Sequence, residues 1–119
     1  MNPNSIGVFG EEKASEYLEK AGYKIIKRNF SCRFGEIDII ACDNDYIVFA
    51  EVKLRKSDNY GAAAEFVSKT KQSKIIKTAQ YYLRFHASDL QPRFDVIEIY
   101  APEGRTGSIS LNHIENAFW

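Results

Sequence analysis

The chain has 119 residues, of which 45% are hydrophobic and 13% aromatic, with only three prolines and seven glycines. That length predicts a single domain over 1–119 with one core, and the composition excludes a disordered or low-complexity chain. Sixteen basic residues balance sixteen acidic ones, which excludes a protein that coats nucleic acid through bulk charge alone.

Targeting signals and metal-binding cysteine patterns are missing from the sequence. No run of about 18 apolar residues could cross a membrane, and the N-terminus lacks the charged-then-apolar layout of a signal peptide. Cys32 and Cys42 have neither a CxxC spacing nor nearby histidines, which disfavours zinc. We therefore expect a cytoplasmic protein that binds no membrane.

The first half of the chain predicts one helix and three strands. Apolar residues recur with a helical period over about 6–21, and Gly22 ends this helix. A strand over 23–28 follows, and the runs 35–42 and 46–54 form a hairpin around an Asp-Asn-Asp turn.

The second half predicts a long helix and two strands. The helical pattern covers 62–86, with apolar residues on one side, cations on the other, and Gln72 as a polar group on the inward side. Pro92 precedes a strand over 94–100 that is apolar on both faces, and a short strand follows near 108–111. The order is α-β-β-β-α-β-β, an α/β fold with a central mixed sheet flanked by two long helices.

Positive charge gathers in one segment of this neutral chain. Between positions 53 and 77, seven cations stand against two anions, a net charge of +5. Part of this segment is therefore expected to face phosphate. A plain solvated surface explains its cations almost equally well. Phosphate contacts are expected at five residues in and near the segment: Arg33, Arg55, Lys56, Lys69 and Lys71.

The residues that carry chemistry lie in the predicted hairpin. Alternation places Asp38 with Glu36 and Ile40 on one face of the first strand. It places Glu51 with Lys53 on one face of the second strand. Pairing of the two strands can bring these acids and the lysine together.

Such a set fits the hydrolysis of a phosphodiester bond. Mg²⁺ binds through one or two carboxylates and keeps several waters, one of which can attack phosphorus. Asp38 and Glu51 are the expected ligands, and the backbone carbonyl of Val52, a hard oxygen, is a plausible third. Lys53 would orient the water or stabilise the developing charge. The pattern predicts a metal-dependent nuclease.

The spacing of these residues is weak evidence on its own, because acidic and basic residues are common. The alternative is the solvated face of an antiparallel hairpin, on which Glu51 and Lys53 only add solubility. Long apolar residues flank these positions, and helices before and after the hairpin could cover both of its faces. These two features count against the alternative.

The two hairpin strands resemble a known signature. The segments 35–40 and 49–55 look like the PD-(D/E)XK nuclease motif, with Ile37 where the motif name has proline. More narrowly, the whole chain resembles the YraN family of uncharacterised bacterial proteins, predicted endonucleases related to archaeal Holliday junction resolvases. The similarity runs from Gly7-x-x-Gly10-Glu11 in the first helix to the closing residues 113–118.

The resemblance implies a restriction-endonuclease-like fold with Mg²⁺ or Mn²⁺ at Asp38 and Glu51 and with Lys53 near the attacking water. It also implies that Glu11 reaches the metal, often through water; its alternative is an ordinary glutamate on the helix surface. By analogy, DNA is the nucleic-acid partner, and branched or junction DNA is the preferred substrate. A homodimer is likewise implied, because symmetric cleavage of a junction needs two sites.

Further polar residues have weaker assignments. Gln72 could hydrogen-bond the site's carboxylate or lysine, or a phosphate; its alternative is an amide that caps a backbone group. Asp95, polar on an apolar strand, is expected to form an ion pair with Arg93 or Lys53, with a role at the metal site as its alternative. His113 is expected to be structural.

Two other functions stay open. One is a nucleic-acid-binding or protein-interaction domain with this fold and little or no catalytic activity. The trio of two acids and a lysine disfavours it, because a domain freed from catalysis has no chemical need to hold them together. The other is an enzyme acting on RNA, which nothing in the sequence excludes.

Overall fold

Two helices and five strands make up the described part of the chain, in the predicted α-β-β-β-α-β-β order. The computed structural model describes residues 5–55, 67–103 and 107–118. Neither helix within these ranges combines the length and hydropathy that a membrane span requires. The elements are α1 (Ser5–Lys20), β1 (Lys24–Cys32), β2 (Gly35–Cys42), β3 (Tyr46–Arg55), α2 (Lys69–Phe85), β4 (Gln91–Tyr100) and β5 (Ser110–Ile114).

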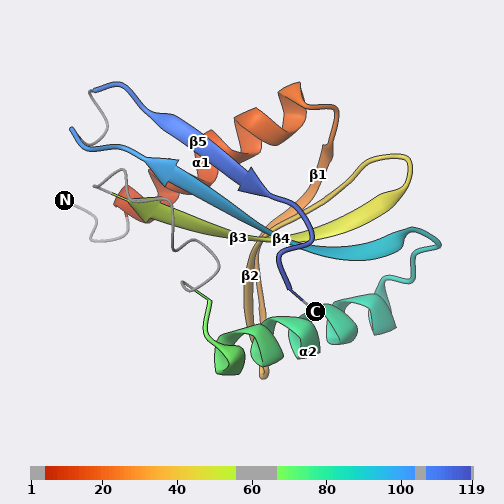
Figure 1. The fold of residues 1–119 in the computed structure, drawn as a ribbon. Coiled ribbons are helices and arrows are strands. Elements are labelled where there is room, and N and C mark those ends of the chain that lie inside the picture. Colours follow the sequence, from red (N-terminus) through yellow and green to blue (C-terminus); the bar gives the residue numbers. More distant parts are fainter. Residues whose placement is uncertain (1–4, 56–66, 104–106, 119) are drawn as a thin grey trace.

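The five strands form one mixed sheet in the order β1-β2-β3-β4-β5. Neighbouring strands are antiparallel except β3 and β4, which run parallel from Tyr46 beside Gln91 to Arg55 beside Tyr100. Parallel neighbours need a crossover connection, and α2 lies in it. Figure 1 shows α1 and α2 on opposite sides of the strands. The predicted α/β fold with a mixed sheet flanked by two helices is confirmed.

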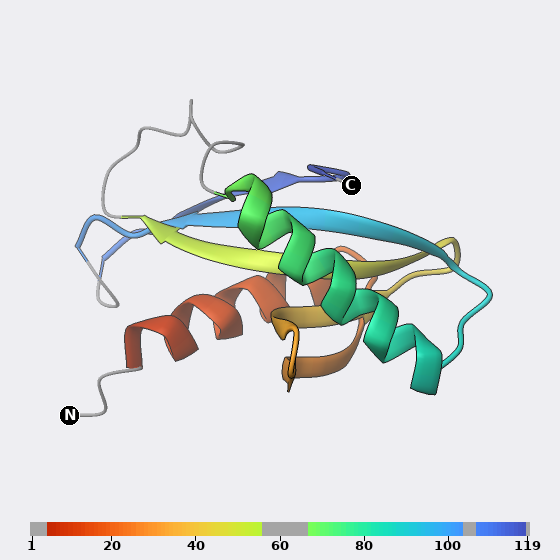
Figure 2. The same cartoon turned by 90° about the horizontal axis from the view of Figure 1, so that it is seen from below.

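The core occupies both faces of the central strands. Leu18 of α1 packs in a cluster with Val48 and Ala50 of β3. Tyr82 of α2 packs in a second cluster with Phe49. Because successive side chains of a strand point to opposite faces, β3 is buried on both sides, as expected beneath two helices. Figure 2 shows α2 running across the strands.

The hairpin of β1 and β2 is irregular where Asp38 lies. The register shifts between Ile25 and Lys27 and is unshifted from Ile39 to Ile37. Asn29, opposite Asp38, has a φ of 54°. Asparagine tolerates this left-handed conformation better than most residues. Ile39 packs in the cluster under α1, whereas Ile37 packs in the cluster under α2. The strict alternation predicted for β2 is therefore broken at Asp38, since its two neighbours pack on opposite faces of the sheet.

Several element boundaries differ from the prediction. The second helix begins at Lys69 and not at 62, because Ser68 caps it by accepting a 3.1 Å hydrogen bond from the backbone N–H of Lys71. Positions 62–66 of the predicted helix lie outside the described residues. Pro92 lies inside β4, next to its first residue, where the loss of one ladder N–H is tolerated. The last strand is Ser110–Ile114, further along the chain than 108–111.

Candidate metal-binding and catalytic site

Two strands and the first turn of α2 meet around the carboxylate of Glu51. This side chain is only 6% exposed and lies on the face that α2 covers. Its Oε1 lies 2.8 Å from Nζ of Lys71 and 3.7 Å from Nζ of Lys53. A buried carboxylate is stable only when cations or hydrogen bonds compensate it, and here two lysines do so.

Asp38 lies beside Glu51 because it stands where a strand partner of β3 would be. The β2–β3 ladder ends at Ile39, and Oδ2 of Asp38 accepts a 2.8 Å hydrogen bond from the N–H of Val52, the residue after Glu51. Burial, and after it the charge of Glu51, raise the pKa of Asp38 to about 7, although the Val52 bond lowers it. The structure thus brings together the two predicted acids and Lys53.

Among the described residues, Lys71 is the cation nearest to Glu51. The sequence did not predict this contact. Burial lowers the pKa of Lys71, but the hydrogen bond and charge of Glu51 outweigh burial, so the net shift is upward. Lys71 is therefore held as a cation. Its predicted contact with phosphate stays a prediction, and the structure adds an ion pair with a candidate ligand.

Glu11 of α1 approaches the site from the other layer. Its side chain is 15% exposed, which contradicts the alternative of an ordinary surface glutamate. Oε1 is 3.9 Å from a guanidinium nitrogen of Arg28, and among the described residues no hydrogen-bond partner reaches this buried oxygen. Its charge also contributes to the raised pKa of Asp38. Three elements therefore bring negative charge to one region.

The donor set fits a hard divalent cation. The charges of Glu51 and Glu11 both disfavour the ionised form of Asp38. One buried oxygen of Glu11 has no hydrogen-bond partner among the described residues, and Asp38 uses a single oxygen for its bond to Val52. Mg²⁺ prefers such oxygens and needs only one or two carboxylates besides water. Within the described residues, no three His, Cys, Asp or Glu side chains converge as a ready metal cage. The predicted ligands Glu11, Asp38, Glu51 and Val52 thus include donors of the right chemistry without forming such a cage.

Three further predicted residues that the structure describes have other surroundings. Gln72 donates a 2.9 Å hydrogen bond to the carbonyl of Val67, which is the backbone-capping alternative, so its predicted catalytic contact is not observed. Lys69 is exposed at the start of α2, and Arg33 is exposed in the turn between β1 and β2. Lys56 lies outside the described residues.

Glu98 is a buried acid that the sequence analysis missed. It is fully buried in β4, directly beside Lys53 in the parallel register. Oε1 accepts a 3.0 Å hydrogen bond from Asn112, and Oε2 lies 3.9 Å from Nε of Arg55 with no hydrogen-bond partner among the described residues. The only available signal was a charged residue between two isoleucines in a strand that was otherwise predicted to be buried.

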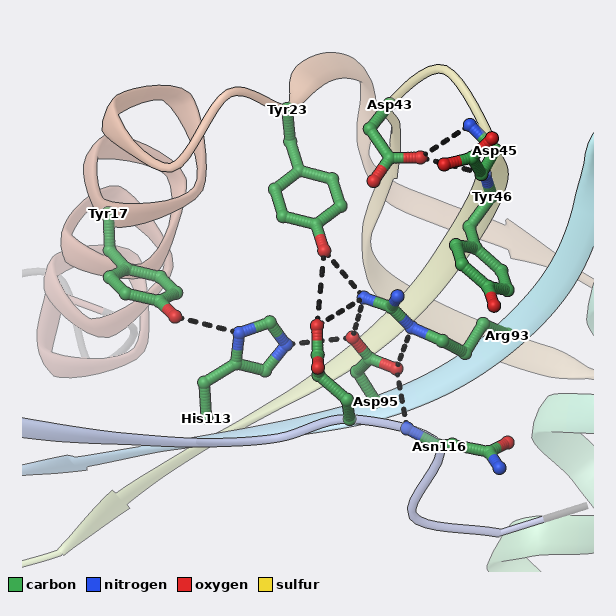
Figure 3. Close-up of polar contacts among 10 residues, drawn as sticks. Tyr17, Tyr23, Asp43, Asp45, Tyr46, Arg93, Asp95, His113 and Asn116 are labelled. Atoms are coloured by element: carbon green, nitrogen blue, oxygen red, sulfur yellow. Dashed lines mark hydrogen bonds and ion pairs between the residues drawn. The ribbon is translucent and has the colours of Figure 1, made fainter.

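A second polar cluster holds the C-terminal segment on the α1 side of the sheet (Figure 3). Asp95 is fully buried and accepts two hydrogen bonds from Arg93, at 2.9 and 2.8 Å, which confirms that predicted pair. It also contacts Nε2 of His113 at 2.7 Å and accepts a 3.0 Å bond from the N–H of Asn116. Nδ1 of His113 is 2.8 Å from the hydroxyl of Tyr17, so the cluster joins β4, β5 and α1.

Hydrogen bonds from this cluster compensate the charge of Asp95. Burial raises its pKa, but the hydrogen bonds from His113 and Arg93 outweigh burial, so the net shift is downward. This carboxylate therefore stays ionised and structural, and His113 has the structural role that was predicted.

The raised pKa of Asp38 predicts how stability depends on pH. In the folded protein Asp38 keeps its proton up to about pH 7, whereas the unfolded chain loses it near pH 4. Wild-type protein in EDTA should therefore lose stability as pH rises from 4 to 7, and Asp38→Asn should remove this loss. At pH 8 the variant should be more stable by about 1–3 kcal/mol in chemical denaturation.

Asp89→Asn is the matched control, because Asp89 is exposed and should leave the pH profile unchanged. Parallel pH profiles for wild type and Asp38→Asn would show that Asp38 is not held among repelling acids.

The fold and these contacts define an α/β protein with a buried carboxylate–lysine cluster between its central strands and a helix. Residues 10–99 match the model of the uncharacterised protein family UPF0102. The chain belongs to this family.

Relatives from several bacteria cover nearly the whole chain. A UPF0102 protein of Caldanaerobacter subterraneus is 46% identical over 99% of this chain and 98% of its own. One from Caldicellulosiruptor saccharolyticus is 44% identical over 99% and 100%, and one from Clostridium acetobutylicum is 48% identical over 94% and 92%. The names of these relatives state the family and no activity.

Proposed function

We propose that the protein is a metal-dependent nuclease that hydrolyses phosphodiester bonds in DNA. One observation carries the proposal: the buried carboxylate of Glu51 is held by two lysines beside Asp38. Repelling acids next to cations are costly to keep in a fold, and perturbed groups of this kind concentrate at functional sites.

The residues have distinct parts in this proposal. Asp38 and Glu51 would hold Mg²⁺ or Mn²⁺ with the carbonyl of Val52, and Glu11 would reach the ion through water. When bound, the ion would supply a water of lowered pKa and neutralise charge on the phosphate. Lys53 would orient that water or stabilise the charge that builds on the phosphate oxygens.

The similarity to the PD-(D/E)XK signature and to resolvase-like proteins supports the same function. By that analogy, branched or junction DNA is the proposed substrate. A homodimer is the proposed assembly, since cutting a junction symmetrically takes two sites.

A second candidate is a nucleic-acid-binding domain that keeps the fold with little or no hydrolysis. One contact favours it: the 2.8 Å ion pair with Lys71 occupies an oxygen of Glu51 that a metal would need. Lys71 would have to move from this oxygen, or share it, before Glu51 could bind the ion through it.

Cleavage assays separate the two candidates. Wild-type protein and Asp38→Asn are incubated with four substrates (duplex DNA, single-stranded DNA, a four-way junction and RNA) in Mg²⁺, in Mn²⁺ and in EDTA. The proposal expects metal-dependent cleavage of DNA by wild type and a loss of at least about 100-fold in the variant. Equal residual cleavage by both proteins would reveal a contaminant, and binding without cleavage would favour the second candidate.

A further inference from the structure

The helix α2 carries an excess of positive charge although the chain as a whole is neutral. Its 17 residues include five cations and no acid. Lys71, in the first turn, contacts Glu51 of the candidate site, and Arg84 lies in the last turn. The helix therefore carries four cations in its first half, beginning beside the candidate site, and one more in its last turn.

Aromatic rings accompany these cations at the far end of α2. A hollow of about 440 Å³ there lies between the helix and the turn that joins β1 to β2. Phe85 is 63% exposed, the most of any large hydrophobic side chain in the described residues. Three rings follow one another in space: the centroids of Phe85 and Tyr81 are 5.0 Å apart, and those of Tyr81 and Phe34 are 6.0 Å apart. The residues that line the hollow, called here the basic–aromatic hollow, are Arg33, Phe34, Lys77, Gln80, Tyr81, Arg84 and Phe85.

The cations and aromatic rings of the hollow together indicate which kind of molecule binds there. None of the described residues that line the hollow is acidic, so a second copy docked symmetrically would bring its cations against the same cations. An apolar peptide would offer no negative charge to the cations of the hollow. Duplex nucleic acid offers phosphates but keeps its base faces stacked inside. Single-stranded nucleic acid offers both phosphates for the cations and free base faces for the rings.

We propose that the basic–aromatic hollow binds unpaired nucleotides of a nucleic acid. One base stacks on the exposed ring of Phe85, next to Tyr81, while Arg33, Lys77 and Arg84 contact the flanking phosphates. Arg33 already lies 4.8 Å from the centroid of the Phe34 ring, so a planar cation is fixed at the edge of the hollow.

The distance between the hollow and the candidate site predicts the form of the substrate. This inference rests on the proposed nuclease function. Phe85 follows Lys71 by fourteen positions in one helix. At 1.5 Å per residue this is about 21 Å, or about six nucleotide steps of a duplex strand. The preferred substrate is thus a duplex that opens into single strand about six nucleotides from the phosphate that is cut.

Binding is measured by fluorescence anisotropy in EDTA with labelled oligothymidylate of 12 nucleotides and with a 12-base-pair duplex. Phe85→Ala should weaken binding of the single strand by about 10-fold and leave duplex binding within about two-fold. Phe85→Trp should keep the affinity, and its fluorescence should be quenched by the single strand but not by the duplex. Because Phe85 is exposed, these changes should not disturb folding. Ile109→Ala, which removes another exposed apolar side chain, is the control.

Three results would overturn the proposal. They are unchanged affinities of Phe85→Ala for both nucleic acids, an equal loss of both affinities, and the loss of a dimer in sedimentation without a change in nucleic-acid affinity. Because binding is measured without metal, its outcome is independent of cleavage. If single strands bind through Phe85 and nothing is cleaved, only the nuclease proposal fails. If Phe85→Ala cleaves plain and branched duplexes with wild-type preference, only the hollow's proposed role fails.

Discussion

Replacing Lys53 by methionine is expected to lower the rate of DNA hydrolysis by about 100- to 1,000-fold at saturating Mg²⁺, which is the usual loss when a charge-stabilising group is removed. Lys53 lies 3.7 Å from Glu51 and is only partly buried, so it can turn toward a phosphate. Methionine keeps the length of the side chain and removes its charge. Single-turnover cleavage of a labelled substrate measures the effect.

Lys71→Met provides the matched comparison, because it removes the other lysine that contacts the same carboxylate oxygen. Lys71 competes with a metal for that oxygen, so its loss should lower the Mg²⁺ concentration needed for half-maximal cleavage. The rate at saturating Mg²⁺ should change by less than about 10-fold. A larger loss of rate with Lys71→Met than with Lys53→Met would assign the charge-stabilising role to Lys71.

Replacing Arg93 by methionine is expected to destabilise the fold by about 3–5 kcal/mol, the usual cost of stranding one member of a buried ion pair. Asp95 is fully buried, and Arg93 donates two of its hydrogen bonds. The remaining contacts with His113 and Asn116 do not replace a guanidinium. The free energy of unfolding from urea denaturation, followed by circular dichroism, measures the loss.

A double-mutant cycle shows whether the stranded charge is the cause. Asp95→Asn added to Arg93→Met should cost less than the sum of the two single changes, with a coupling of about 1–3 kcal/mol. Arg84→Met, at an exposed arginine, should change stability by less than about 0.5 kcal/mol. Additive losses would mean that Arg93 acts through its packing against Tyr46 and Tyr23 and not through its charge.

Local patterns predicted most of the fold. The order of elements, the hairpin turn and the apolar side of α2 depend on residues close together in sequence, and such signals survive without tertiary information. The predicted start of α2 was wrong because the helical pattern of the sequence continues through residues before Ser68. The first residue of the helix is defined by the capping geometry of Ser68, which the pattern does not show. The break of alternation at Asp38 was not predicted, because it accompanies the positive φ of Asn29 in the neighbouring strand and strand periodicity gives no signal of it.

Strand periodicity was enough to predict that Glu51 and Lys53 share a face of one strand and that Asp38 can lie across from them. The packing of the elements was needed to show that, among the described residues, Lys71 is the cation nearest to Glu51 and that Glu98 is buried beside Lys53. It also decided that Gln72 points to a backbone carbonyl instead of the site. These contacts join residues of different elements, so they depend on how helix and strands pack, and no local period encodes that packing.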